Sequence, residues 1–212
     1  LKTVKITTFG GVPYIYSLLI KIGLERLKHK SLKYITHAGG ALDANSLLIL
    51  YEFCKKNNFE FISMYGSSEA TSRMSYLPFA NMKKKIGSIG KGLQKSFIIK
   101  DDKNNDIIEP FKKGELIFQG DNVCLGYANN WKDLALGDNN LSILSTGDEG
   151  YFDKEGFFYI SGRKSRYVKL FGHRINLDEI EKTLSKKFPN CYIKFINEKI
   201  IIISNKNFNL DK

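Results

Sequence analysis

The chain has 212 residues, of which 42% are hydrophobic, 26% charged and 13% aromatic, which is typical of a globular protein with its own core. Lys21 and Glu25 interrupt the longest apolar stretch, so the sequence predicts no membrane span. Residues 1–12 lack the pattern of a secretory signal. The three cysteines are far apart and form no zinc motif, so we expect a cytoplasmic protein with reduced thiols.

The formal net charge of +11 raises the question of a nucleic-acid partner. Most of this charge is lysine that is scattered along the chain, and the densest runs are residues 83–85 and 163–169. We expect the run at 83–85 to lie in a solvated loop. Basic and aromatic residues do not alternate as they do in RNA-binding proteins. We therefore expect no nucleic-acid partner, and nucleic-acid binding is the weakest of three functional hypotheses.

The first third of the chain predicts alternating helices and strands. Apolar residues at helical spacing over 14–28 follow Pro13, which suits the start of a helix. Residues 33–38 predict a strand, Asp43 predicts the cap of a helix through 56, and residues 59–64 predict a second strand. This order favours a parallel α/β layer, in which ligands bind beyond the carboxyl ends of the strands.

Short strands and glycine turns replace this pattern after residue 85. Residues 96–100, 115–119 and 157–160 predict a small antiparallel sheet or distorted barrel. A strand at 167–171, a helix at 177–187 and strands at 192–196 and 199–204, joined by Asn197-Glu198, form a last unit that is too small to be a complete domain. The predicted fold is thus α/β (1–84), then a β-barrel-like subdomain (85–163), then a partial α+β domain (164–212).

Residues 65–69, Tyr-Gly-Ser-Ser-Glu, follow the strand predicted at 59–64. Tyr65 is suited to stack on a base, and the hydroxyls of Ser67 and Ser68 are suited to donate to a phosphate. Glu69 is a hard oxygen ligand of the kind that Mg²⁺ prefers. Taken alone, the motif is also explained as a helix-capping cluster, and on its own this simpler interpretation is favoured.

Two further charged residues flank predicted strands. Asp148 lies in a glycine-flanked turn, and one carboxylate is able to accept from both hydroxyls of a ribose. Arg163 ends the run after residues 157–160 and is suited to contact the same sugar or a phosphate. An ordinary turn aspartate and a surface arginine remain the alternatives.

Five segments occur in order: GGA (39–41), YGSSE (65–69), GELIFQGDNVCLGY (114–127), STGDEGYF (145–152) and GRKSRYVKLFGHRINLDEIE (162–181). Together they resemble the adenylate-forming superfamily, which contains acyl-CoA synthetases, luciferases and the adenylation domains of non-ribosomal peptide synthetases. The resemblance covers residues 32–182. It implies an enzyme that uses ATP and Mg²⁺ to convert a carboxylic acid into an acyl-adenylate. The acyl group then passes to the thiol of CoA or of a carrier protein's phosphopantetheine.

The resemblance also implies roles for individual residues. Those that would line the adenine pocket are Gly39, Gly40, Ala41, Tyr65 and Gly66. Those that would contact the ribose or pack under the nucleoside are Asp148, Arg163 and Ile160. Ser68 would contact the α-phosphate and Glu69 would bind Mg²⁺. Lys169 would act in the thioester-forming conformation, and Ser165 takes the position of the hinge between the large and small domains.

The resemblance places a mixed set of side chains around the acid: Thr36, Ala38, Met64, Ser72 and Arg73. The segment 168–181 resembles the branch that loads carrier proteins, including enzymes that activate D-alanine, which favours an amino acid or small acid as the substrate. The substrate supplies the carboxylate nucleophile, so no catalytic triad is required. His29, His37 and His173 are expected to be structural or exposed.

The chain departs from the family pattern at four places. Residues 1–30 contain no glycine-rich phosphate loop like the one that the family has upstream of these motifs, and Lys206 and Lys212 have no glycine motif like the one that supports the family's C-terminal lysine. Ser165 replaces the usual Asp or Lys of the hinge, and Ser145 replaces an arginine. We therefore expect a fragment that is inactive alone. The competing hypothesis is a catalytically dead module that keeps the fold and binds a carrier protein or another subunit.

Overall fold

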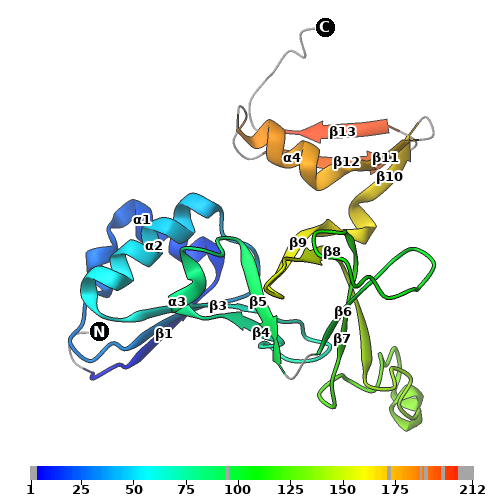
Figure 1. The fold of residues 1–212 in the computed structure, drawn as a ribbon, viewed down its shortest axis with the longest axis horizontal. Helices are drawn as coiled ribbons and strands as arrows, with labels where there is room; N and C mark the ends of the chain where they lie inside the picture. The colour runs from blue at the N-terminus through cyan, green and yellow to red at the C-terminus, as the bar shows by residue number, and fades with distance from the viewer. Residues whose placement is uncertain are drawn as a thin grey trace, which may run out of the picture.

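The computed structural model describes residues 4–93, 96–170, 173–186, 188, 191–196 and 199–204 (Figure 1). The predicted turn at Asn197-Glu198 and the two lysines Lys206 and Lys212 lie outside these ranges. The side chains of Ser165 and Lys169 are also outside the description, although their backbones are included.

One nine-stranded sheet runs through most of the chain, in the order β1-β2-β3-β4-β5-β9-β8-β7-β6. Its strands are β1 (Thr8–Gly11), β2 (Tyr34–His37), β3 (Glu60–Tyr65), β4 (Ser75–Leu77), β5 (Ser88–Gly92), β6 (Phe97–Lys100), β7 (Gly114–Gln119), β8 (Ile143–Phe152) and β9 (Phe158–Arg163). The first three strands pair in parallel, which confirms the parallel layer predicted for the first third of the chain. The strands from β6 to β9 pair antiparallel, which confirms the antiparallel sheet predicted there, although β8 itself was not predicted.

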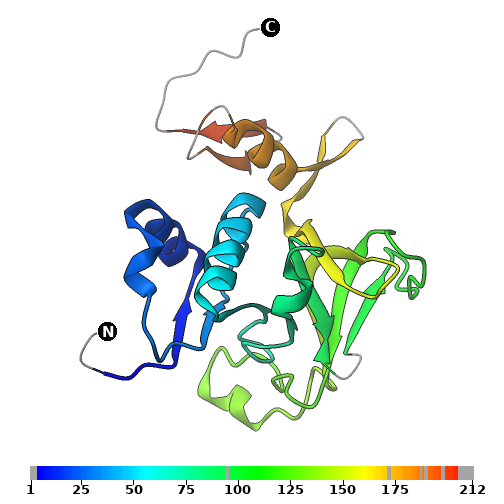
Figure 2. The same cartoon turned by 60° about the vertical axis from the view of Figure 1, so that its left-hand side comes forward.

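Helices α1 (Pro13–Ile22) and α2 (Ala44–Asn57) lie side by side and cover one face of the parallel strands (Figures 1 and 2). The core between these helices and the sheet includes Tyr16 of α1, Ile35 of β2 and Phe61 of β3, which have no exposed surface. The Asp43 carboxylate accepts from the backbone N–H of Ser46 at 3.0 Å, so the predicted helix cap is confirmed.

The helix predicted over 14–28 is interrupted. It ends at Ile22, and Gly23 takes a φ of +102° before a short 3-10 helix, Leu24–Leu27. An L side chain rarely adopts this positive φ, so the glycine separates two helical segments that share one apolar pattern. Apolar spacing alone did not reveal this break, because Leu27 is buried and continues the pattern beyond the glycine.

Strand β5 connects the two predicted units, 1–84 and 85–163, because it pairs with a strand of each. Its Gly92 pairs with Ser75 of β4, and its Ser88 pairs with Tyr159 of β9. A second core, which includes Met74, Phe97 and Leu116, packs between β4 and the antiparallel strands. Strands β1, β4, β5 and β8 were not predicted from the sequence, and Asp148, which was expected in a turn, lies within β8. The domain boundaries at 84/85 and 163/164 stay predictions.

Lys85 corrects the prediction of a solvated lysine loop at 83–85. Its ammonium group lies 2.7 Å from Asp153 and 2.5 Å from Glu155, and its side chain is only 12% exposed. Lys83 does remain in solvent, with 59% of its side chain exposed. Lys85 therefore joins the segment after the short helix α3 (Phe79–Met82) to the turn between β8 and β9.

The last part of the chain packs around a small core of its own. It contains the hairpin of β10 (Tyr167–Leu170) and β11 (His173–Asn176), helix α4 (Leu177–Ser185), and the hairpin of β12 (Tyr192–Ile196) and β13 (Lys199–Ile203). Leu177, Cys191 and Ile193 form its buried centre. The helix expected from residue 177 is confirmed, but β11 was not predicted. No helix among the described residues is long and apolar enough to span a membrane.

Candidate functional site

The parallel pairing of β2 with β3 brings two of the predicted motifs to one edge of the sheet. His37 is in register with Ser63, so the loop of Gly39 and Gly40 and the segment after Tyr65 both leave the carboxyl ends of adjacent strands. The two glycines have φ values of +79° and +148°. A Cβ on Gly40 would lie 3.1 Å from Pro13, so this loop requires glycine for both backbone freedom and space.

The segment after Tyr65 forms a tight turn instead of starting a helix. A Cβ on Gly66 would lie 2.2 Å from the carbonyl oxygen of Thr71, so only glycine fits there. The backbone N–H of Ser67 donates to the same oxygen at 3.0 Å. Residues 66–74 are turns and bends that lead into β4, so the helix-capping interpretation of YGSSE is wrong.

Tyr65, Asp148 and Arg163 form a hydrogen-bonded cluster. The Tyr65 hydroxyl donates to Asp148 Oδ2 at 2.5 Å, and Arg163 Nε lies 2.9 Å from Asp148 Oδ1. Burial is the main reason that the pKa of Tyr65 is raised, and the negative charge of Asp148 adds to the effect. Asp148 is only 5% exposed, whereas 67% of the Arg163 side chain faces solvent. The arginine therefore keeps donors available at the surface.

Register explains why these groups meet. Asp148 on β8 pairs directly with Arg163 on β9, which places the two side chains on one face of the antiparallel sheet. The backbone N–H of Asp148 donates to the Thr146 hydroxyl at 3.1 Å, which holds the start of this segment in place. Ile160, which was assigned to the nucleoside by resemblance, is partly buried against the second core.

Glu69 is held at both its backbone and its side chain. Its carbonyl oxygen accepts from the N–H of Cys124 at 2.7 Å, and its Oε1 accepts a short hydrogen bond from the Tyr127 hydroxyl. The hydrogen bond from Tyr127 is the main reason that the pKa of Glu69 is lowered, and the positive charge of Arg163 acts in the same direction. Arg163 is therefore within electrostatic reach of both Glu69 and Asp148.

The residues assigned to the acid pocket are only partly brought together. Thr36 and Met64 lie on the face of the sheet opposite to His37 and Ser63, because side chains alternate along a strand. Arg73 Nε donates to Met64 Sδ at 3.1 Å. Ala38 follows β2, and Ser72 is exposed in the turn before β4.

His37 belongs to the core and not to the motif cluster. It is 3% exposed, stacks on Phe61, and shares a hydrogen bond of 3.2 Å with Ser63. Burial lowers its pKa to about 4. His29 contacts Ser31 at 2.8 Å, and the side chain of His173 lies outside the described residues.

The two residues that flank Ser165 contact different parts of the molecule. Lys164 Nζ lies 2.6 Å from Glu115 of β7. Arg166 instead lies 2.7 Å from Asp178 of α4 and donates to the carbonyl oxygen of Ile193 at 2.6 Å. Contacts with the last unit begin just before Ser165, because the backbone N–H of Arg163 already donates to Asp178 at 3.2 Å. The role of Ser165 as a hinge stays a prediction.

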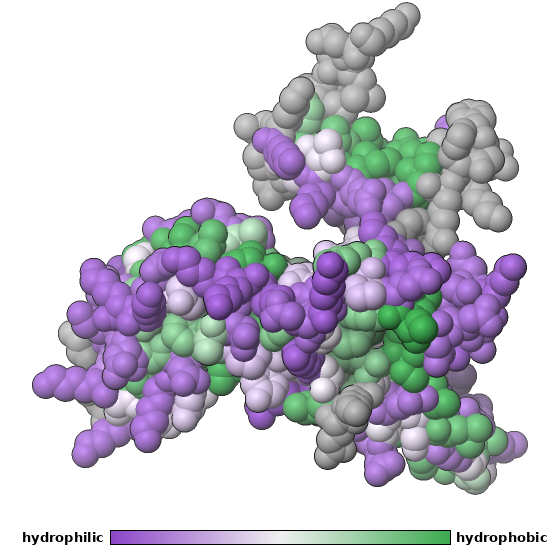
Figure 3. Space-filling model, in the orientation of Figure 1, coloured by the Kyte–Doolittle hydropathy of each residue, from purple (hydrophilic) through white to green (hydrophobic). Residues whose placement is uncertain are grey.

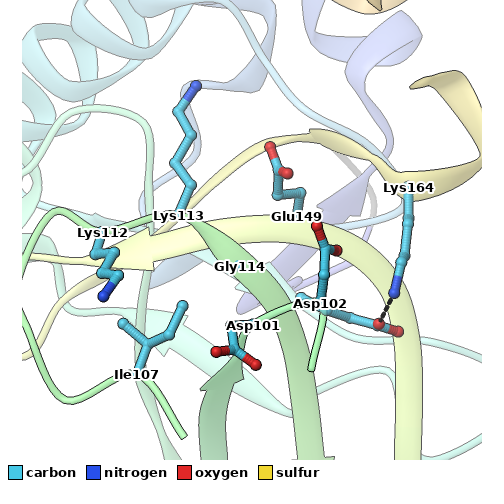
Figure 4. Close-up of a pocket in the computed structure, with 9 residues that line it drawn as sticks. Asp101, Asp102, Ile107, Lys112, Lys113, Gly114, Glu149 and Lys164 are labelled. Atoms are coloured by element: carbon cyan, nitrogen blue, oxygen red, sulfur yellow. Dashed lines mark hydrogen bonds and ion pairs between the residues drawn. The ribbon is translucent and has the colours of Figure 1, made fainter. Parts of the chain in front are cut away.

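A cavity of about 130 Å³ lies beside the Lys164–Glu115 pair (Figure 4). Its lining is mostly charged: Asp101, Asp102, Ile107, Lys112, Lys113, Gly114, Glu115, Glu149 and Lys164. Glu149 and Asp148 are consecutive residues of β8, so they point to opposite faces of the sheet. The cavity is therefore separate from the cluster around Asp148.

Tyr127 is the last residue of the motif at 114–127, and its sequence position predicted no role for it. Tyr127 contacts Glu69 although 58 residues separate them. The only signal in the sequence was a tyrosine directly after Gly126 at the end of the motif. A contact between two loops carries no periodicity, so it could not be derived from spacing.

The comparisons agree with the cluster of motifs. Residues 1–128 match the family described as AMP-binding enzyme, so the chain belongs to the AMP-binding enzyme family. It is 34% identical over 186 residues to a long-chain-fatty-acid–CoA ligase of Bacillus subtilis, covering 85% of this chain and 32% of the relative. It is also 34% identical over 137 residues to the 2-succinylbenzoate–CoA ligase of the same species, covering 65% and 28%.

A solved structure supports the fold. The chain resembles O-succinylbenzoate coenzyme A synthetase of Bacillus subtilis in complex with ATP and magnesium ion, with a TM-score of 0.71 and 25% identity. The match covers 97% of this chain and 43% of that structure. The chain thus spans about a third of the length of the curated ligases it matches. The resemblance to the adenylate-forming superfamily is confirmed for this part of the fold.

The residues at the motif cluster fit a nucleotide and a divalent cation. The Ser67 hydroxyl is buried without a partner at hydrogen-bond distance, although it is near enough to Glu69 to contribute to the lowered pKa there. A buried polar group of this kind is normally satisfied, and a phosphate oxygen would satisfy it. No group of three or more metal-binding side chains occurs among the described residues, so Mg²⁺ at Glu69 would need phosphate oxygens as further ligands.

Proposed function

We propose that this chain is the part of an ATP-dependent carboxylic-acid-activating ligase that holds the nucleoside and the α-phosphate. The hydrogen-bonded cluster of Tyr65, Asp148 and Arg163 is the main support for this proposal. The cluster connects the end of β3 to the β8–β9 pair. Side chains suited to contact a base, a ribose and a phosphate therefore come from strands on both sides of β5.

Each side chain in the cluster has a chemical role under this proposal. Asp148 accepts from the ribose hydroxyls, and Arg163 neutralises nearby negative charge with its exposed donors. Gly39, Gly40 and Ala41 lie on the sheet edge where an adenine would bind, next to Tyr65. Ser68, which is exposed in the turn, contacts the α-phosphate.

Activation of the acid creates negative charge at the α-phosphate as pyrophosphate leaves. Glu69 is the proposed protein ligand of Mg²⁺, which when bound would supply positive charge to stabilise the α-phosphate oxygens. The lowered pKa keeps Glu69 ionised at neutral pH, as a cation ligand must be. The acid itself would lie near Thr36, Ala38, Met64, Ser72 and Arg73.

Transfer of the acyl group to a thiol belongs to the whole ligase and is also part of the proposal. CoA is the acceptor named for the two curated relatives. The alternative acceptor is a carrier protein, which the segment 168–181 favours by resemblance. Lys169 would act in this second half-reaction, after rotation at Ser165. A cytoplasmic location and the absence of a nucleic-acid partner stay predictions.

Calorimetric titration with AMP tests the proposal. We expect the wild-type chain to bind AMP weakly, and Asp148→Asn to reduce the affinity at least about tenfold, because a charged hydrogen-bond acceptor is lost. Asp106→Asn is the matched control, since Asp106 is 56% exposed and lies outside the cluster. If both variants bind AMP like the wild type, the ribose assignment is wrong.

The catalytically dead module is the alternative, and one contact bears on it. Ser145, at the position of the family arginine, donates a short hydrogen bond to Glu115, so it joins β8 to β7. Pyrophosphate exchange with a panel of acids separates the two proposals. We expect no exchange from this chain alone, and exchange from a longer protein that contains it. No exchange with any acid from that longer protein would favour the dead module.

A further inference from the structure

The loop between β7 and β8 forms two hydrogen bonds with Glu69. The backbone N–H of Cys124 donates to the Glu69 carbonyl oxygen at 2.7 Å, and the hydroxyl of Tyr127 donates to Oε1 of the same residue. The first contact fixes the backbone of Glu69 and the second fixes its carboxylate. Both contacts come from the four consecutive residues 124–127, so one short stretch of the loop holds the backbone and the side chain of Glu69.

The loop is built to present Tyr127 in this position. Gly126 has a φ of +152°, and a Cβ there would lie 3.3 Å from the side chain of Asn139. The Asn140 side chain donates to the carbonyl oxygen of Cys124 at 2.7 Å, which folds the end of the loop back onto its start. Glycine therefore allows the turn after which the tyrosine reaches Glu69.

The Tyr127 ring contributes little to packing. The residue is 73% exposed, and its neighbours in the loop, Trp131 and Leu134, are each 77% exposed. Apolar side chains gather over this loop at the lower right of the space-filling view (Figure 3). Because the ring is not part of a core, the main contact of Tyr127 with the rest of the molecule is the hydrogen bond from its hydroxyl to Glu69.

We propose that Tyr127 is a positioning residue for Glu69, and that it orients the carboxylate for a divalent cation. This inference rests on the proposed function, in which Glu69 is the protein ligand of Mg²⁺. Hydrogen bonds to a ligating group from a neighbouring residue fix its orientation, and their loss typically weakens metal binding about 10- to 100-fold. Tyr127 donates to Oε1 of Glu69 and would hold the carboxylate in one orientation when a cation is bound.

A Mn²⁺ titration tests this inference, in the presence and in the absence of AMP. Binding is measured as the decrease in the electron paramagnetic resonance signal of free Mn²⁺. We expect Tyr127→Phe to weaken Mn²⁺ binding about tenfold and to leave AMP affinity in chelator unchanged. Tyr14→Phe is the matched control, because Tyr14 is 72% exposed and lies on α1, and it should bind Mn²⁺ like the wild type. Glu69→Gln should remove the binding.

The outcomes separate this inference from the proposed function. If Glu69→Gln abolishes Mn²⁺ binding but Tyr127→Phe does not weaken it, the role of Tyr127 is refuted and the nucleotide site stands. If the wild type binds AMP but no Mn²⁺, or if Glu69→Gln has no effect, Glu69 is not a cation ligand and the inference fails. If the wild type binds neither, the proposed function fails with it.

Discussion

The Tyr65 hydroxyl donates to the Asp148 carboxylate at 2.5 Å, across 83 residues of sequence. Tyr65 ends the last of the parallel strands, and Asp148 lies in the antiparallel part of the sheet. A single hydrogen bond thus connects two motifs that the sequence could order but not place in contact.

Removal of this hydroxyl should destabilise the chain. Asp148 is 5% exposed, so Tyr65→Phe leaves a buried carboxylate oxygen without its donor, at a cost of about 1–3 kcal/mol. The free energy of unfolding in urea measures this loss. Tyr51→Phe is the control, because the Tyr51 ring packs on Phe79, and its effect should stay within about 0.5 kcal/mol. Equal effects of the two variants would contradict the importance of the bond.

The buried His37 predicts a pH dependence of stability. Its pKa falls from 6.5 to about 4 in the folded chain, so protonation favours the unfolded state. Stability from the neutral ring is complete above about pH 6.5 and is lost as the pH falls toward 4, at up to about 1.4 kcal/mol per pH unit. Urea unfolding at several pH values should show this slope.

His37→Gln removes the titrating group, so the slope between pH 6.5 and 4 should become flatter. An unchanged slope in His37→Gln would show that the pH dependence comes from another group.

Two lysines that are two positions apart, Lys83 and Lys85, allow a buried ion pair to be compared with an exposed one. Lys85 contacts Asp153 with side chains that are 12% and 10% exposed, whereas Lys83 contacts Glu52 with side chains that are 59% and 56% exposed. Burial alone would raise the pKa of Asp153, but hydrogen bonds from Lys85 and from backbone N–H groups outweigh it and lower the pKa.

We expect Lys85→Met to lower the midpoint of thermal unfolding clearly, because it leaves Asp153 without its cation. Lys83→Met should have almost no effect, since exposed ion pairs contribute little. Similar midpoints for both variants would mean that the Lys85 contacts do not hold the β8–β9 turn in place.

Arg166 predicts how firmly the last unit is attached. Its guanidinium binds Asp178, Glu181 and the carbonyl oxygen of Ile193 together, a geometry that the single ammonium group of lysine cannot reproduce. Arg166→Lys should therefore expose residues 177–196 to faster limited proteolysis. Arg26→Lys, which loses one exposed contact to Ile22, should be cut at the wild-type rate.

Local rules predicted some elements better than others. Strands β2 and β3, helix α2 with its Asp43 cap, and the start of α4 followed from periodicity and capping. Strands β4 and β5 are short and contain Ser, Gly and Lys, so their sequences carry almost no strand pattern, and tertiary pairing makes them strands.

The candidate site shows the same limit. The residues Tyr65, Asp148 and Arg163 were found because their motifs occur in a recognisable order. The contact of Lys85 with Asp153 and the contact of Tyr127 with Glu69 join loops that are 68 and 58 residues apart. No local pattern encodes such contacts, because they depend on how the strands are ordered in the sheet.

Hydrogen exchange with and without AMP tests most directly whether the segments form one nucleotide site. We expect the backbone amides of residues 65–69, 146–149 and 161–163 to exchange more slowly together when AMP is added, and Asp148→Asn to remove the protection in all three segments at once. Protection that is confined to one segment, or that persists in Asp148→Asn, would contradict a single site shared by Tyr65, Asp148 and Arg163.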